Sequence, residues 1–79
     1  MRLDLFLKDS RIIKRRTIAK EFCERGLVKV NGKIVKPSFD VKSNDFVTVK
    51  FGDKEFTVSA KVEVVGKKER ASYDPIETR

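Results

Sequence analysis

The segment Ser10–Gly32, SRIIKRRTIAKEFCERGLVKVNG, combines a basic cluster, an amphipathic helix pattern and a tight-turn signal. Its central apolar residues recur at the spacing i, i+1, i+4 and i+5, which is one face of an α-helix. These residues are Ile18, Ala19, Phe22 and Cys23. Gly26 follows at the position where a left-handed residue commonly ends a helix. The segment therefore predicts a short helix that packs its apolar side on a small domain.

The same segment carries a dense positive charge. Five cations fall within ten residues: Arg11, Lys14, Arg15, Arg16 and Lys20. Residues 1–40 have a net charge of +6 and residues 41–79 have +1, within a total of +7. Because a merely solvated surface does not need its charge confined to one half of the chain, this asymmetry favours a localised face that binds a polyanion.

A first helix is expected before this segment, within residues 1–8. Leu3, Phe6 and Leu7 recur at helical spacing. Asp4 lies near the expected start, where a carboxylate suits the positive end of the helix dipole. If the two helices pack side by side, Arg2 joins the basic cluster.

Two hairpins are expected after the second helix. Asn31-Gly32 lies between alternating residues in 27–35, which is the strongest short-range signal for a two-residue hairpin turn. Gly52-Asp53 separates two further alternating runs, 46–51 and 55–65. Asn44 is expected to accept a left-handed conformation in a turn before the first of these runs.

The last residues, 67–79, read KKERASYDPIETR and contain a proline. We expect a mostly irregular, charged C-terminal tail there, after a single domain over residues 1–66. The patterns together predict an α+β fold with two short helices packed on a small antiparallel sheet. A chain of 79 residues buries only a small core, so a pocket for a large cofactor is not expected.

The composition argues against catalysis and metal binding. The chain has no histidine and one cysteine, which removes histidine acid–base chemistry, most zinc sites and any internal disulfide. Cys23 lies on the apolar helix face and is expected to be a small buried hydrophobe. We therefore predict a non-enzymatic protein of a reducing, cytoplasmic compartment, without cofactor, metal or membrane segment. An amphipathic membrane anchor is disfavoured because the core needs Phe22.

The candidate binding residues are the cations of the first half. The helix cluster suits phosphates, and arginine adds two-pronged contacts and stacking that lysine does not match. Lys33 and Lys36, beside the Asn31-Gly32 turn, form a weaker patch, since lysines also protect exposed strand edges.

The order of motifs over residues 1–51 resembles the αL RNA-binding domain, found in small-subunit ribosomal protein four, bacterial tyrosyl-tRNA synthetase, pseudouridine synthases and heat-shock protein fifteen. The resemblance rests on Met1–Asp4, Phe6-Leu7, Ser10-Arg11, Lys14–Thr17, Ala19, Gly26, Val28, Val30–Gly32, Lys36–Ser38, Val41 and Asp45. It implies the αL fold and RNA binding. By position, it assigns contacts first to Arg2 and Arg16, then to Lys14, Arg15 and Lys20, with Arg11, Lys33 and Lys36 as support.

Within that group the chain looks most like the stand-alone ribosome quality-control P-site tRNA-stabilising factors, through the Ile13–Arg16 run and the Lys67–Tyr73 segment. This resemblance implies binding to rRNA and peptidyl-tRNA on obstructed large ribosomal subunits. It also implies a partner factor that extends the stalled chain with alanine, without a template. We expect the chain to act as a monomer. Leu5 stands where the family usually has lysine, and Asn44 where it usually has glycine.

Three alternatives remain at this stage. A heat-shock-fifteen-like recycling factor would move tRNA on stalled subunits without supporting alanine tailing. A helix-turn-helix protein would prefer duplex DNA to structured RNA at equal salt. A ribosome assembly or protein-interaction module would keep its partner at salt concentrations that remove electrostatic contacts.

Overall fold

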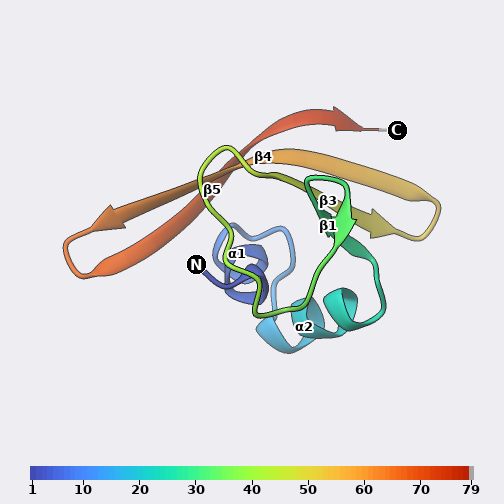
Figure 1. Ribbon diagram of the computed structural model, residues 1–79, viewed down its shortest axis with the longest axis horizontal. Helices are drawn as coiled ribbons and strands as arrows, with labels where there is room; N and C mark the ends of the chain where they lie inside the picture. Colours follow the sequence, from blue (N-terminus) through green and yellow to red (C-terminus); the bar gives the residue numbers. More distant parts are fainter. Residues whose placement is uncertain (79) are drawn as a thin grey trace.

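The computed structural model describes residues 1–78 and has two helices on one face of a five-stranded antiparallel sheet (Figure 1). The helices are α1 (Leu3–Asp9) and α2 (Arg16–Glu24). The strands are β1 (Val28–Val30), β2 (Lys33–Ile34), β3 (Phe46–Phe51), β4 (Lys54–Val65) and β5 (Lys68–Thr78). Their order in the sheet is β2-β1-β3-β4-β5. The α+β fold expected from the sequence is confirmed.

The core lies between α1 and the three central strands. Alternate residues of β1, β3 and β4 face the helices, because successive side chains of a strand point to opposite faces. The buried strand residues are Val28, Val30, Val47, Val49, Val58 and Ala60. Leu3, Phe6 and Leu7 of α1 are fully buried against them, and the cluster also contains Ala19 and Cys23 of α2 and the loop residues Ile13 and Val41.

The C-terminus of α2 is closed by the expected glycine. Gly26 has a φ of +73°, and its N–H donates to the carbonyl of Cys23 at 3.1 Å. The N–H of Leu27 donates to the carbonyl of Phe22 at 2.9 Å, which completes a Schellman motif. The buried face of α2 is narrower than the apolar face expected from the sequence. Ile18 is 39% exposed, because α2 packs on the core through its small residues Ala19 and Cys23.

The Asn31-Gly32 turn has the predicted geometry. Asn31 and Gly32 have φ values of +51° and +82°, the two positive angles of a type I′ turn. The Asn31 side chain accepts the N–H of Phe46 at 3.0 Å and donates to Asp45 at 3.1 Å. The turn is thereby tied to the start of β3. Asn44 has the left-handed conformation expected for it, with a φ of +76°.

The prediction of a mostly irregular tail is wrong, because Lys68–Thr78 forms β5 and pairs with β4. The proline that suggested irregular structure lies in an edge strand, beside a register shift at Thr57 and Val58, where a missing N–H is tolerated. Position 79 of the predicted tail lies outside the described residues. The β4–β5 hairpin projects beyond the helices (Figure 1).

The N-terminal segment contacts distant parts of the chain at both ends of α1. The α-amino group of Met1 donates to the Asp40 carboxylate at 2.7 Å, and this bond raises the pKa of the amine and lowers that of Asp40. At the other end of α1, the Asp9 carboxylate accepts the N–H of Ala71 in β5 at 2.7 Å. Helix α1 is therefore held at both ends by residues far along the chain.

Candidate nucleic-acid interface

A buried carboxylate organises the two arginines that the sequence ranked first. The Asp4 side chain is only 3% exposed, and its Oδ1 and Oδ2 accept Nε and Nη2 of Arg2, both at 3.3 Å. Nε of Arg16 lies 3.6 Å from Oδ2. We call Arg2, Asp4 and Arg16 the Asp4 cluster. Both arginine side chains are about half exposed, so they remain open to solvent while the buried Asp4 carboxylate fixes the orientation of their guanidinium groups.

The fold brings these residues together from two helix starts. Arg2 lies directly before α1 in an extended conformation and forms an isolated β-bridge with Asp40. Its side chain therefore lies beside the first turn of α1, which carries Asp4. Arg16 is the first residue of α2, which packs against α1. Arg2 therefore lies beside Arg16, as expected if the two helices pack side by side. The position of Asp4 between the two arginines is not evident from the sequence, in which Asp4 is a carboxylate in the first turn of a helix.

The start of α2 concentrates positive charge. Arg15 is the N-cap residue and is exposed, and its side chain does not cap the free N–H groups of the first turn. Cations at this end oppose the helix dipole and cost roughly 0.3–1 kcal/mol each. An anion bound there would satisfy both the arginines and the uncapped N–H groups.

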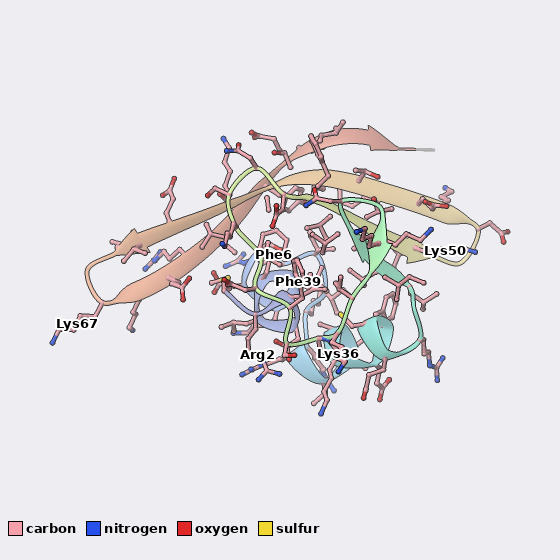
Figure 2. The ribbon with its side chains drawn as sticks, in the orientation of Figure 1. Arg2, Phe6, Lys36, Phe39, Lys50 and Lys67 are labelled. Carbon is pink, nitrogen blue, oxygen red and sulfur yellow. The ribbon has the colours of Figure 1, made fainter. Side chains whose placement is uncertain are left out.

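Lys20 and Lys36 lie near the Asp4 cluster. They line, with Arg2, a groove of about 690 Å³ between α2 and the segment after β2, which we call the α2 groove. Its floor is apolar and includes Cys23, Ile34 and Pro37. Figure 2 shows Arg2 and Lys36 on the same side of the molecule. The structure thus brings one of the two hairpin lysines to the predicted face.

The other predicted residues lie elsewhere. Arg11 and Lys14, in the loop between the helices, line a separate groove of about 700 Å³ together with residues of β5. We call it the β5 groove; its full lining is Lys8, Asp9, Arg11, Lys14, Lys68, Glu69, Arg70 and Ala71. Lys33 is exposed at the start of β2 and lines neither groove. Lys8, Lys68 and Arg70 are not among the predicted residues; the irregular tail expected over 67–79 gave no reason to place Lys68 and Arg70 beside Arg11.

Cys23 is a buried apolar residue, as expected from its place on α2. It is 3% exposed, and burial first, then the charge of Asp4, raises the pKa of its thiol to about 11. The thiol is therefore protonated near neutral pH and is not poised as a nucleophile.

This thiol gives the fold a measurable pH dependence. In the unfolded chain the thiol loses its proton above a pKa of 9.0, whereas in the folded chain it keeps the proton up to about 11. The free energy of unfolding should therefore fall as pH rises between these values, by about 2–3 kcal/mol from this group. Urea denaturation of the wild type and Cys23→Ala across that range isolates the effect from the lysines. Identical pH slopes in the two proteins would contradict the assignment.

Residues 1–78 show neither a membrane-spanning helix nor a cluster of metal ligands. Within this range, no helix has the length and apolar character needed to cross a membrane. No three or more His, Cys, Asp or Glu side chains of the described residues come together as a potential metal site.

Comparisons with known proteins identify the family of this chain. The S4 domain family matches residues 1–47. A Bacillus subtilis protein named RQC P-site tRNA stabilizing factor is 51% identical over 73 residues, which cover 91% of this chain and 85% of that protein. A Streptococcus pneumoniae protein of the same name is 59% identical over 54 residues, which cover 68% of this chain and 61% of the relative.

A solved structure supports the same fold. The trimeric structure of Vibrio cholerae Heat Shock Protein 15 superposes with a TM-score of 0.74 at 27% identity, covering 91% of this chain and 81% of that one. The fold described above is therefore shared with that structure. This chain belongs to the S4 domain family and, within it, to the family of the RQC P-site tRNA stabilizing factors.

Proposed function

We propose that this protein binds rRNA and peptidyl-tRNA on obstructed large ribosomal subunits and holds the tRNA in the P site. There it supports the extension of the stalled chain with alanine, without a template, by a separate partner factor. It has no catalytic step of its own and works as a monomer in the cytoplasm. The relatives named RQC P-site tRNA stabilizing factor support the tRNA and ribosome part of this proposal.

The Asp4 cluster is the observation that carries RNA binding. A phosphate needs donors that are fixed in direction and open to solvent, and the half-exposed arginines on a buried carboxylate meet both conditions. Arginine retains free N–H donors beyond those that face Asp4, since its guanidinium has five. Arg2 and Arg16 can thus bind phosphate oxygens while Asp4 keeps them in place.

The mechanism is electrostatic clamping on a rigid face. Arg2 and Arg16 bind phosphates first, and Arg15, at the start of α2, adds to the same positive field. Lys20 and Lys36 extend the contact along the α2 groove, and Arg11, Lys14 and Lys33 support it from further away. Each neutralised phosphate releases counterions, so affinity falls steeply with salt. The clamp raises the occupancy of the tRNA by holding it to rRNA rather than by chemistry.

A recycling factor is the second candidate. The likeness to Heat Shock Protein 15 favours it, because that structure shares the helix pair and the sheet. Such a protein would bind the same subunits through the same arginines but would not support alanine tailing. The two functions differ in their product rather than in their binding site, so a cellular readout must separate them.

The first test is sedimentation of the C-terminally tagged protein from lysate through a sucrose gradient, with the tRNA in each fraction identified. We expect the protein to migrate with free large subunits that still hold peptidyl-tRNA. Migration with small subunits, or as free protein with mixed RNA, would exclude the proposed function and leave general RNA binding. Mass spectrometry of stalled chains in a deletion strain then decides between the candidates, since only the first requires alanine tails to disappear.

A further inference from the structure

The β5 groove gathers cations from two parts of the chain that are distant in sequence. Lys8, Arg11 and Lys14 come from the end of α1 and the loop before α2. Lys68 and Arg70 lie at the start of β5, next to the turn that joins this strand to β4. All five side chains are exposed. A cluster built from segments so far apart forms only in the folded chain.

The acidic residues of the β5 groove already have partners. Asp9 accepts the N–H of Ala71 at 2.7 Å, and Glu69 lies 3.4 Å from the α-amino group of Met1. By contrast, none of the five cations forms an ion pair with a side chain of residues 1–76, the range in which side chains are described. The β5 groove therefore presents positive charge that the fold itself does not neutralise.

The loop that enters the β5 groove is held in an unfavourable backbone conformation. Arg11 has a φ of +67°, a region that costs a non-glycine residue roughly 1–2 kcal/mol. The N–H of Arg11 donates to the carbonyl of Lys8 at 3.1 Å, which fixes this turn. A glycine would adopt the same turn without strain. Arginine at position 11 therefore places a guanidinium group here but lowers the stability of the fold.

The β5 groove is spatially distinct from the Asp4 cluster. Arg2 directly precedes the first residue of α1, whereas Lys8 and Asp9 end that helix. Lys8 lies about 9 Å from Arg2 along the helix axis, and only Lys14, two residues before Arg16, comes from a segment next to the Asp4 cluster. In Figure 2 Arg2 lies beside the helices, away from the tip of the β4–β5 hairpin that Lys67 marks.

We propose that the β5 groove is a second RNA-binding site, which holds the sugar-phosphate backbone of a separate RNA segment while the Asp4 cluster holds the first. This inference rests on the proposed function for the first segment. Among the described residues no aromatic side chain lines the β5 groove, so its five cations favour contacts with phosphates. The protein then joins two RNA segments through opposite ends of α1.

A sandwich assay tests the second site. Bulk tRNA is immobilised on beads, the protein is added, and capture of a fluorescent tRNA is measured. We expect Lys68→Gln/Arg70→Gln to stay on the beads, because the Asp4 cluster is intact, and to lose second-tRNA capture about 10-fold or more. In binary titrations its salt slope should be smaller by about 1–2, since two phosphate contacts are lost.

A matched control removes the same charge outside the groove. Lys50 and Lys67 are exposed residues at opposite hairpin ends of the sheet (Figure 2), and neither lines the β5 groove. Lys50→Gln/Lys67→Gln should capture the second tRNA as the wild type does. Arg11→Gly offers a further check, because it should fold at least as stably as the wild type and still lose capture. Sedimentation velocity without RNA excludes capture by protein self-association.

The outcomes separate the two proposals. If the wild type binds the first tRNA but captures no second one, the second site is excluded and the proposed function stands. Undiminished capture by Lys68→Gln/Arg70→Gln, or an equal loss in the Lys50→Gln/Lys67→Gln control, also overturns the second site. If the wild type binds no tRNA at all, both proposals fail.

Discussion

Replacing Arg2 and Arg16 together by alanine is expected to weaken binding to purified large ribosomal subunits by roughly 30-fold to 10⁴-fold, or about 2–6 kcal/mol. Each arginine supplies an oriented, two-pronged phosphate contact worth about 1–3 kcal/mol. The double alanine variant removes both positive charges and both sets of oriented N–H donors. Pelleting assays across a salt series measure the effect, and the slope of affinity against salt should fall by about two phosphate contacts.

Two further variants show whether orientation or charge is responsible. Arg2→Lys/Arg16→Lys keeps the charge but loses the planar fork, so we expect an intermediate affinity with a nearly unchanged salt slope. Asp4→Asn removes the carboxylate that holds both arginines, and should reduce the preference for ribosomal subunits over bulk RNA. Wild-type affinity in Arg2→Ala/Arg16→Ala would show that RNA binds another face.

Phe6→Ala is expected to leave a large fraction of the chain unfolded. Phe6 is fully buried at the centre of the core (Figure 2), and its removal should cost about 3–5 kcal/mol. A domain of this size has a stability near the low end of roughly 5–15 kcal/mol, so the loss takes most of it. Urea denaturation followed by circular dichroism measures the change.

Phe51→Ala is the matched control, since the same atoms are removed from a side chain that is 41% exposed. Phe51 touches Phe22 with ring centroids 5.5 Å apart, so some loss is expected, but well below that of Phe6→Ala. Equal destabilisation by the two substitutions would mean that the core is not centred where the structure places it.

The sequence predicts best where neighbouring residues decide the structure. Asn31 and Gly32 accept positive φ angles and so specify their own turn, and Gly26 ends α2 for the same reason. The apolar spacing of Leu3, Phe6 and Leu7 places α1 correctly. These signals need no knowledge of the rest of the chain, and the antiparallel sheet follows from the hairpins they define.

Prediction failed where the decisive partner is remote. Asp4 looks like an ordinary first-turn carboxylate until Arg16 is brought beside it by the crossing of two helices. Pro75 indicates irregular structure locally, and only its place on an edge strand makes it acceptable. Because β5 was not expected, the cations Lys68 and Arg70 could not be joined to the loop that they face.

The hydrogen bond between Asp9 and Ala71 has a consequence for the order of folding, because it joins residues 62 positions apart. Hairpins between adjacent strands form within about 1–10 μs, whereas a contact of this span must first close almost the whole chain. We expect the α1–β5 contact to form late. The Asp4 cluster draws only on residues within the first 16 positions. A chain still being synthesised therefore lacks the second groove until its last strand has been released.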